Sequence, residues 1–545
     1  MEIERHRILK FLATVMTALS SIMVVLVAFL MKMILDCAMN KDFGALERSI
    51  GISILYIATY FLINYLKEVL VARYIKNEME DLRRSVYRTI MERDYQSYFS
   101  KSNGEYISAL TNDMTTIEDN YYKAYFLIVQ AVVTFVIAIL SLVVINWQFS
   151  IGVLAIAGFF LATASFTGMG LNDLRTSIQK DMVKFTSKTK DLIAGYEVVR
   201  SFNAQDKMQE QFDRYNHNLE EMKLKFSVRQ GITKVINENL VLLIIFSIMI
   251  LGGWFVITGA LVMGSLIAIV QLLNSVMNPI NMMLVAVNNS NSTKTMRNQI
   301  TEMLQNTTIK NDANQATHGT FNQEISLAKL NFSYDGAKTV IQNFSFAFQK
   351  GKKYAIIGKS GCGKSTLLRL IQNCYPNYDG EMWVDDHNYR EMSDASFLNL
   401  FSMIHQNVFI FSGTIRENIT LFKDFPEQEI VAAAKSAGLQ FLLEKLPQGL
   451  DTPIKEAGNS LSGGERQRIS IARALIRQAP VLLLDEFTSA LDQFTAQTIE
   501  KEIMILKEQT CIHVTHKLSE ADEHLYDAIL EIDAGQLVKV TQPNV

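Results

Sequence analysis

The sequence predicts a chain in two parts, an all-α domain of six membrane-crossing helices followed by an α/β domain. Hydrophobic residues make up 49% of the 545 residues and charged residues only 20%, which is apolar for a soluble protein. The first half contains long stretches without Asp, Glu, Lys or Arg. The second half alternates short β-rich runs with helical segments around a glycine-rich loop, "GKSGCGKST", as in a mostly parallel sheet.

Length, charge and cysteine usage narrow the class of protein. A chain of 545 residues is too long for one ordinary domain. The net charge of -3 argues against nucleic acid as a partner, because neutralising phosphates needs a clustered surplus of Lys and Arg. The four cysteines have no metal-binding spacing, so we expect neither a zinc site nor a disulfide framework.

Six membrane spans follow from the charge-free stretches. A helix needs roughly 20 mostly uncharged residues to cross a ~30 Å hydrocarbon core. The stretch 124–172 is too long for one crossing and is broken by "INWQ" at 145–148, while "TGALVMG" at 258–264 separates the last two spans. Buried helices of a soluble protein are the alternative, but such helices rarely run so long without a charged face. The predicted spans are 11–35, 49–66, 124–145, 149–171, 239–257 and 264–290.

Lys and Arg near the span ends predict the orientation. They cluster before the first span, after the second and after the fourth, and are absent from the turns after the third and fifth. The positive-inside rule therefore places both termini and the long loops 67–123 and 173–238 in the cytoplasm. We expect the membrane to be a bacterial plasma membrane. Those loops are charge-rich and compatible with helix, so we expect the spans to continue into the cytosol.

The chain then divides into three segments. The membrane domain covers residues 1–304. The polar, weakly patterned segment 305–320 is predicted to be a linker, and residues 321–545 form the α/β domain.

The glycine-rich loop predicts a phosphate site. Gly358, Gly363, Lys364 and Ser365 fit G-x-x-x-x-G-K-[ST] between a predicted strand, 353–357, and a helix, as the motif requires. Its backbone N–H groups and the helix N-terminus would surround phosphates. Lys364 would reach the β- and γ-phosphates, and Ser365 can hold Mg²⁺. The predicted nucleotide-binding residues are Gly358, Ser360, Gly361, Cys362, Gly363, Lys364, Ser365 and Thr366.

A second nucleotide motif is the run "VLLLDE", a hydrophobic strand that ends in two carboxylates. Asp485 at the strand end is placed to bind Mg²⁺ through water. Glu486, one residue further on, is placed to polarise the attacking water. A strand that ends in acids is common alone, but after a phosphate loop it supports nucleotide hydrolysis.

The run "LSGGERQRISIARAL" at 461–475 resembles the signature of ATP-binding cassette (ABC) ATPases. The resemblance implies that ATP and Mg²⁺ bind here and that Ser462, Gly463, Gly464 and Glu465 face phosphate. It also gives roles to residues in "FSY", "IHQNVF", "SALD" and "HVTHKL". These are Tyr334 stacking on adenine, Gln406 contacting Mg²⁺ and the membrane domain, the D-loop at 489–492, and His516 touching the γ-phosphate.

The resemblance extends over the whole chain. Six spans, two long cytoplasmic loops and one cassette look like a half-transporter of the ABC exporter fold. In that family, short coupling helices in the loops contact the cassettes, and we place them near 95–102 and 194–199. Ordinary solvated amphipathic segments are the alternative for both stretches.

Two positions depart from the family pattern. The fifth signature position, usually Gln, is Glu465, which we expect to tune activity rather than abolish it. The segment "KEAGNS" only partly matches the family's cross-linking loop, with Glu456 as its counterpart.

The resemblance implies a mechanism in which the signature of a second cassette closes the ATP site. One chain would therefore pair with a second half-transporter, either another copy or a related chain. Glu486, His516 and Gln406 would act in hydrolysis. The spans carry no acid or base well inside them, so no ion relay is evident. An ATP-driven exporter is the leading hypothesis. Import on the same fold, as of a siderophore, and a non-transporting ATP-gated sensor are the alternatives.

Polar side chains in the last span bear on the substrate. Their spacing of three, four, three and seven residues puts amides on one helical face: Gln271, Asn274, Asn278, Asn281 and Asn288. Either this face lines the translocation cavity or its amides join helices by hydrogen bonds. A cavity without fixed charge suits an amphipathic peptide, lipid or drug better than a small ion.

Overall fold

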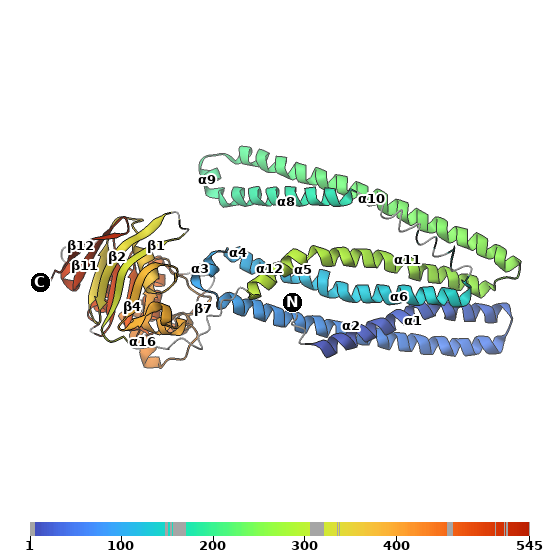
Figure 1. The fold of residues 1–545 in the computed structure, drawn as a ribbon, viewed down its shortest axis with the longest axis horizontal. Helices are drawn as coiled ribbons and strands as arrows, with labels where there is room; N and C mark the ends of the chain where they lie inside the picture. The colour runs from blue at the N-terminus through green and yellow to red at the C-terminus, as the bar shows by residue number, and fades with distance from the viewer. Residues whose placement is uncertain are drawn as a thin grey trace. The chain divides into compact units, whose positions relative to one another are not determined.

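The structure is a computed structural model that divides into two compact units, each described here by itself. The membrane unit comprises Met1–Met91 and Asn103–Asn306, and the ATPase unit comprises Glu92–Ser102 and Thr307–Val545 (Figure 1). The residues that the structure describes are 6–147, 151, 152, 155, 158, 170–305, 321–334, 336, 338–454, 461–506, 508–516, 518 and 522–543.

The membrane unit is helical. Its described elements are α1 (Arg7–Met39), α2 (Phe43–Met91), α4 (Asn103–Leu110), α5 (Asn112–Ile117), the π-helical turn η1 (Glu118–Tyr122), α6 (Lys123–Ile145), α8 (Leu171–Ala194), α9 (Tyr196–Ser201), α10 (Gln205–Ile257), α11 (Met263–Ser292) and α12 (Lys294–Gln305).

Within the described residues, five helical stretches are long and apolar enough to cross a membrane, namely Arg7–Met39, Phe43–Met91, Asn103–Ile145, Gln205–Ile257 and Met263–Gln305. They contain the first, second, third, fifth and sixth predicted spans. The fourth, 149–171, lies almost entirely outside the described residues, as does the predicted linker 305–320.

Two helices continue far beyond their predicted spans. Helix α2 runs from the predicted span end at residue 66 to Met91, and α10 begins at Gln205, well before residue 239. At 1.5 Å per residue, the α2 extension alone is about 37 Å long. The charge-rich loops are therefore mostly helical, as their composition predicts.

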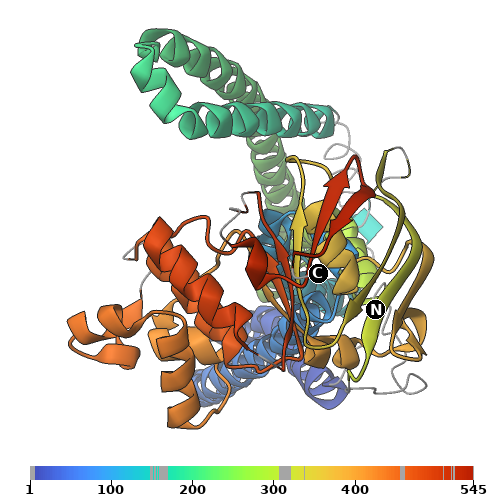
Figure 2. The ribbon, with the colours of Figure 1, turned by 90° about the vertical axis from the view of Figure 1, so that its left-hand side faces the viewer.

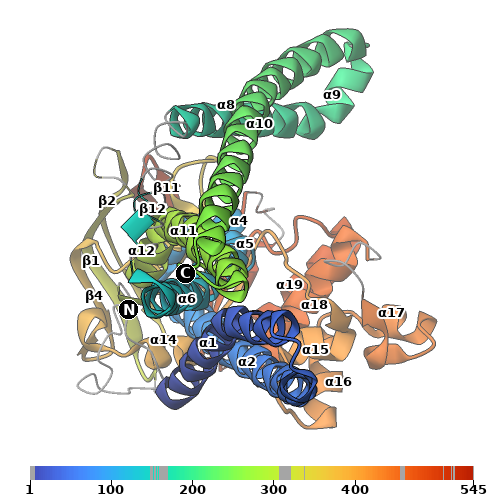
Figure 3. The ribbon, with the colours of Figure 1, turned by 90° about the vertical axis from the view of Figure 1, so that its right-hand side faces the viewer.

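Helices α1, α6 and α11 pack together around small side chains. Ala28, Ala138 and Ala268 are buried in this core beside Leu272, and small residues let helix backbones approach closely. Helices α8 and α10 form a separate antiparallel pair, which Figures 1 and 3 show standing away from α1 and α2. A cluster of buried apolar side chains joins α10 to α11 near one end.

The ATPase unit combines two main sheets with surrounding helices. Its strands are β1 (Glu324–Ser333), β2 (Thr339–Gln349), β3 (Lys353–Ile357), β4 (Asp379–Val384), β5 (His387–Asn388), β6 (Phe401–Ile404), β7 (Gly413–Thr414), β8 (Pro453–Ile454), β9 (Val481–Asp485), β10 (Thr510–Val514), β11 (Ala528–Asp533) and β12 (Gln536–Thr541). Its helices are α3 (Tyr95–Phe99), α13 (Lys364–Ile371), α14 (Asp394–Leu400), α15 (Ile415–Thr420), α16 (Glu427–Ser436), α17 (Gln440–Lys445), α18 (Gly463–Leu475) and α19 (Gln493–Met504). Its described residues also form short 3-10 turns at Tyr389–Glu391, Gly449–Asp451 and Glu523–Leu525.

Sheet topology positions the site. The six-stranded sheet has the order β12-β11-β3-β10-β9-β6, and its β11, β3, β10, β9 and β6 are parallel. An antiparallel sheet, β2-β1-β4-β5, forms a second layer. Helices α15 to α18 gather on one side of the unit, and β1, β2 and β4 lie on the other (Figures 2 and 3).

Two neighbouring strands of the parallel sheet, β9 and β10, are completely buried. Every residue of β9 and β10 is buried, which is the pattern of parallel strands covered on both faces. A helical membrane part followed by an α/β ATPase part is the predicted fold class, and it is confirmed.

Candidate nucleotide site

The carboxyl ends of β3, β6, β9 and β10 meet at one edge of the parallel sheet, and the predicted site residues follow those ends. The glycine-rich loop follows β3, Gln406 follows β6, Glu486 follows β9 and His516 follows β10. Ligands of open parallel sheets bind at this edge. The topology thus brings together motifs that lie up to 158 positions apart in the sequence, from Gly358 to His516.

Glycines shape the loop between β3 and α13. Gly358 has φ +155° and Gly363 has φ +104°. A Cβ on Gly358 would lie 2.2 Å from the carbonyl oxygen of Ile532, and one on Gly363 would lie 2.9 Å from that of Val340. Both positions therefore exclude a side chain, which leaves backbone N–H groups to form the loop surface.

The buried amine of Lys364 closes the loop. Its Nζ donates to the carbonyl oxygens of Gly358, at 2.8 Å, and of Lys359, at 3.0 Å. The Nδ1 atom of His516 lies 3.5 Å from the same amine. This cation sits at the N-terminus of α13, where the helix dipole also favours an anion.

Ser365 and Asp485 form the part of the site that fits Mg²⁺. The hydroxyl of Ser365 donates to Oδ1 of Asp485 at 2.9 Å. Burial raises the pKa of Asp485, because loss of water disfavours the ionised carboxylate. A cation beside this carboxylate would offset that desolvation cost. Among the described residues, no three His, Cys, Asp or Glu side chains form a metal cluster. A few hard oxygens suit Mg²⁺, which keeps waters and substrate phosphates as ligands.

Glu486 stands at the centre of three predicted catalytic residues. Its Oε2 accepts a hydrogen bond from Nε2 of Gln406 at 2.7 Å, and its Oε1 lies 2.7 Å from Nε2 of His516. Its backbone is left-handed, with φ +48°, a conformation that costs on the order of 1–3 kcal/mol in a non-glycine residue. Such strain, held by the Glu486 N–H bond to the Val514 carbonyl at 3.0 Å, is typical of functional positions.

Tyr334 lies beside the loop in contact with two other rings. Its hydroxyl is 2.8 Å from Oγ1 of Thr366. Its ring lies edge-on to Phe332, with centroids 5.0 Å apart, and to Tyr375, at 5.3 Å. The side chain is 46% exposed, so a ring face is available to a base.

The sequence reasoning missed Tyr375. This ring contacts Tyr334 on one side and Tyr95 of α3 on the other, with centroids 5.5 Å apart. Beside it, Nδ2 of Asn377 donates to Oε1 of Gln96 at 3.4 Å. Helix α3 occupies the stretch where a coupling helix is predicted and packs within the ATPase unit. No motif marks Tyr375, because its role depends on a contact made across the fold.

The signature residues form the start of α18. Ser462 accepts from the N–H of Glu465 at 3.3 Å, while Oε2 of Glu465 accepts from the N–H of Ser462 at 2.7 Å. This reciprocal capping box works with Glu or Gln at the third position, which explains why Glu465 preserves the local fold. Within the described part of the chain, no hydrogen bond connects Ser462, Gly463, Gly464 or Glu465 to the phosphate loop. Glu456 and its segment, 455–460, lie outside the described residues.

The neighbouring motifs have structural roles as well. In the D-loop, Asp492 caps α19 by accepting from the N–H of Thr495 at 3.0 Å, and the N–H of Ser489 donates to the Glu486 carbonyl at 3.1 Å. His513 is buried in β10 against Phe487 and Tyr526.

The fold and this site define a membrane-bound ATPase of the phosphate-loop class. Comparison with known families then narrows the class. Residues 341–489 match the ABC transporter family, and residues 10–280 match the ABC transporter transmembrane region.

Similar proteins agree over most of the chain. An ATP-dependent lipid A-core flippase of Haemophilus ducreyi is 30% identical over 519 residues, which cover 94% of this chain and 88% of that protein. The flippase of the same name from Vibrio cholerae is 29% identical over 468 residues, 85% of this chain and 80% of that one. A bacterial Atm1-family ABC exporter with ATP bound has a TM-score of 0.80 at 22% identity, with 100% of this chain and 96% of that chain covered.

The chain belongs to the ABC transporter family, as an exporter-type half-transporter with fused membrane and ATPase parts. It binds ATP and couples ATP hydrolysis to transport. The family resemblance, the fold class and the enzyme class predicted from the sequence are confirmed. The roles of individual site residues, the segment boundaries and the Mg²⁺ site stay predictions.

Proposed function

We propose that the protein exports an amphipathic, lipid-like molecule as a pair of half-transporters. The flippases similar to it are named for lipid A-core. The amide face of α11 supports a polar but uncharged route: Asn278, Asn281 and Asn288 are exposed, and Gln271 and Asn274 are half-buried. Exposed amides favour a cavity lining over helix-to-helix hydrogen bonds.

The composition of the ATP site is the main support for pairing of two half-transporters. The loop, Asp485, Glu486, Gln406 and His516 meet at one sheet edge, yet the signature residues make no hydrogen bond to them among the described residues. The N-terminus of α18 is a second anion site. A second cassette would bring its α18 to the open side of the ATP, as the family resemblance implies.

A surface of the membrane unit also supports pairing. Leu224, Val228, Ile232 and Val235 lie on one face of α10, in the charge-rich part predicted to be cytoplasmic. Each is between 52% and 61% exposed. We name these four residues the α10 stripe. Apolar side chains at helical spacing outside the membrane are the usual mark of a protein interface.

The site residues suggest how hydrolysis would proceed. Lys364 and the α13 N-terminus would hold the phosphates. Glu486 would take the proton of the attacking water, and Gln406 and His516 would keep that carboxylate in place. Ser365, Asp485 and the amide oxygen of Gln406 are the groups that would hold Mg²⁺, which supplies charge neutralisation on the phosphates when bound.

Reconstituted vesicles test the proposal. The purified protein should hydrolyse ATP faster in the presence of a glycolipid such as a lipid A analogue, and should move it to the leaflet remote from the ATPase. Lys364→Ala should abolish both, whereas Lys359→Ala, which changes an exposed lysine of the same loop, should abolish neither. ATP hydrolysis indifferent to every lipid and drug would favour a sensor, and movement toward the ATPase side would favour an importer.

A further inference from the structure

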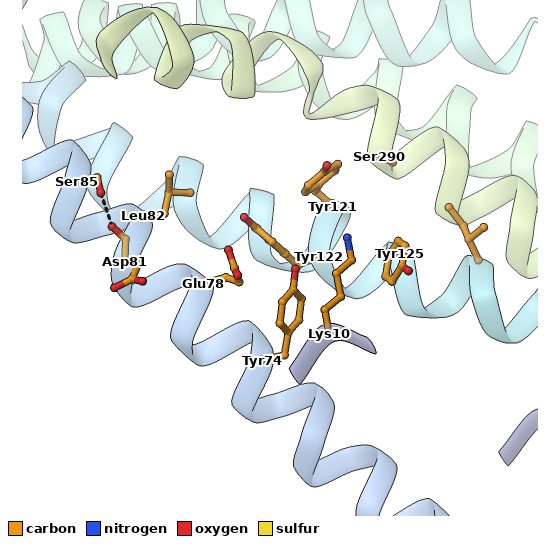
Figure 4. A pocket seen from close by; sticks show the side chains of 11 residues that line it. Lys10, Tyr74, Glu78, Asp81, Leu82, Ser85, Tyr121, Tyr122, Tyr125 and Ser290 are labelled. Atoms are coloured by element: carbon orange, nitrogen blue, oxygen red, sulfur yellow. Dashed lines mark hydrogen bonds between the residues drawn. The ribbon is translucent and has the colours of Figure 1, made fainter. Parts of the chain in front are cut away.

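Polar side chains around a cavity of the membrane unit already have partners within the chain. This cavity, of about 150 Å³, lies between α1, α2, α6 and α11 (Figure 4). The amine of Lys10 lies 4.6 Å from the ring centroid of Tyr125. The rings of Tyr74 and Tyr122 meet edge to face at 6.2 Å, and Glu78 also interacts within the chain. The ATPase unit, by contrast, contains a buried polar pair whose contacts are incomplete.

The pair is Glu500 of α19 and His513 of β10. His513 is 1% exposed, and its Nδ1 atom lies 2.7 Å from the hydroxyl oxygen of Tyr526. Its other ring nitrogen, Nε2, has no hydrogen-bond partner among the described residues and lies 3.8 Å from Oε1 of Glu500. A buried polar atom without a partner is costly, and a neutral histidine can donate or accept at this nitrogen, depending on its tautomer. An approach of about 1 Å would give Nε2 a hydrogen bond to the carboxyl group.

The same carboxyl oxygen reaches the turn that follows Glu486. The hydroxyl of Thr488 donates to Oε1 of Glu500 at 3.5 Å, which is long for a hydrogen bond between oxygens. Thr488 stands two residues after Glu486. Contacts at catalytic sites are often long before the reacting complex forms, and they shorten in that complex. The side chain of Glu500 is 18% exposed, so little water competes with Thr488 for it.

Phe487, between Glu486 and Thr488, packs on the other member of the pair. Its ring is fully buried and meets the ring of His513 edge to face, with centroids 5.0 Å apart. The left-handed backbone of Glu486, with φ +48°, persists only if the surrounding structure holds it. Each of the two residues that follow Glu486 therefore contacts one member of the pair.

We propose that Glu500 is a positioning residue for ATP hydrolysis. It holds the turn after Glu486 by bonding Thr488 and His513, which fixes the turn between α19 and β10. The proposal rests on the role of Glu486 as the base, proposed above, because the turn keeps the Glu486 carboxylate directed at the attacking water. His516, whose Nε2 lies 2.7 Å from Glu486, follows the strand that contains His513. One strand thus anchors both the turn and this histidine.

An apolar replacement of Glu500 separates positioning from folding. Glu500→Leu removes the polar contacts and exchanges a desolvated carboxyl group for an apolar one, so its melting temperature should equal or exceed that of the wild type. In the full-length protein, kcat for ATP hydrolysis should nevertheless fall about tenfold, since small misplacements of catalytic groups are costly. KM for ATP should change less than about twofold, because Lys364 and Tyr334, which would hold the nucleotide, are untouched. Glu500→Gln can still bond Thr488 and His513 and should keep kcat close to the wild-type value.

Thr488 provides an independent arm of the test, which also covers a Glu500→Leu variant that does not fold. Thr488→Val removes the hydroxyl but keeps the shape and should lower kcat about tenfold, whereas Thr488→Ser keeps the hydroxyl and should keep kcat. Because both changes break one contact, Glu500→Leu combined with Thr488→Val should be little slower than either alone. Glu502→Leu is the matched control, since Glu502 is an exposed residue of the same helix. It should leave kcat unchanged.

Glu486→Gln, measured alongside, keeps this test distinct from the proposed role of Glu486. Hydrolysis that persists in Glu486→Gln would overturn that role and the positioning of Glu486 together. If Glu486→Gln is inactive but Glu500→Leu and Thr488→Val both hydrolyse ATP at the wild-type rate, only the positioning role of Glu500 is wrong. A loss of kcat in Glu500→Leu that comes with a lowered melting temperature, while Thr488→Val is unaffected, would also overturn it.

Discussion

At the scale of the residue, Glu465 places a negative charge where the sequence family usually has a neutral amide. Its carboxylate accepts a hydrogen bond from the N–H of Ser462 at the start of α18. The N-terminal end of a helix attracts phosphate. Glu465→Gln keeps the capping box and removes the charge. We expect KM for ATP to fall about two- to fivefold, since a charge at a helix end contributes ~0.3–1 kcal/mol. ATPase kinetics measure this.

The control for this prediction is Glu465→Ala, which removes the charge and the cap together. It should lower the melting temperature, because a lost side-chain cap costs about 1 kcal/mol. An unchanged KM in the Gln variant would show that the carboxylate does not face the nucleotide.

Glu500 and His513 lead to a second prediction at this scale, on how the stability of the protein depends on pH. Their side chains lie 3.8 Å apart, but burial, followed by the charge of Asp522, raises the pKa of Glu500 to about 7, and burial lowers that of His513 to about 3. Both groups are therefore neutral near pH 6 and form no ion pair. A raised carboxyl pKa gives stability that is present below about pH 4.5 and lost as pH rises through about 7. The depressed histidine pKa acts oppositely, costing stability as pH falls below about 6.5.

Glu500→Gln removes only the carboxyl titration. The variant should therefore gain stability relative to the wild type between pH 5 and pH 8, by up to about 3 kcal/mol. Thermal unfolding of the full-length protein at both pH values checks it. If the difference between variant and wild type is the same at pH 5 and pH 8, the Glu500 pKa is not raised. His513→Phe, which leaves Glu500 in place, should not reproduce the alkaline gain.

At the scale of the element, parallel strands account for what the sequence predicted well. The strands 353–357 and 481–485 end at the residues that the motifs mark, and carboxyl ends of parallel strands share an edge. The sequence alone therefore predicts that Asp485, Glu486 and His516 lie near the loop. Motif spacing says nothing about side-chain contacts between layers, so the Tyr95, Tyr375 and Tyr334 rings could not be expected. Likewise, the Ser462–Glu465 capping box can be recognised in the sequence only once α18 is known to begin there.

The three rings predict how α3 communicates with the adenine site. Tyr375 is the ring between Tyr95 of α3 and Tyr334, and aromatic pairs contribute about 0.5–1.5 kcal/mol each. Tyr375→Ala should raise KM for ATP about two- to tenfold and reduce the number of molecules transported per ATP. Coupled transport and ATPase measurements on the same vesicles give both values.

Tyr375→Phe tests whether the ring or the hydroxyl matters. Because the observed contacts are between rings, the Phe variant should behave like the wild type in both measurements. Normal coupling in Tyr375→Ala would exclude a role for this ring in communication.

At the scale of the whole molecule, the ATP site and the α10 stripe impose the same requirement. The phosphate loop has no signature beside it among the described contacts. The α8 and α10 pair, which stands away from α1 and α2 (Figure 3), carries exposed apolar side chains. A second half-transporter would meet both needs at once.

Substitutions in the α10 stripe separate pairing from folding. Burying an unpaired charge at an interface costs several kcal/mol, so Val228→Lys with Ile232→Lys should convert a two-copy particle into single chains. The particle mass should be measured in detergent with ATP, in a chain that also carries Glu486→Gln so that hydrolysis is slow. Gln230→Lys is the matched control, because residue 230 is exposed and lies about 200° around the helix from the stripe at 100° per residue. Its particle should stay paired.

The stripe variant should still bind ATP weakly through its own loop, yet lose cooperative hydrolysis, since each loop then lacks a facing α18. A stripe variant that remains a two-copy particle with wild-type ATPase would place the pairing surface elsewhere, whereas a wild-type chain that is single even with trapped ATP would require a different, related partner.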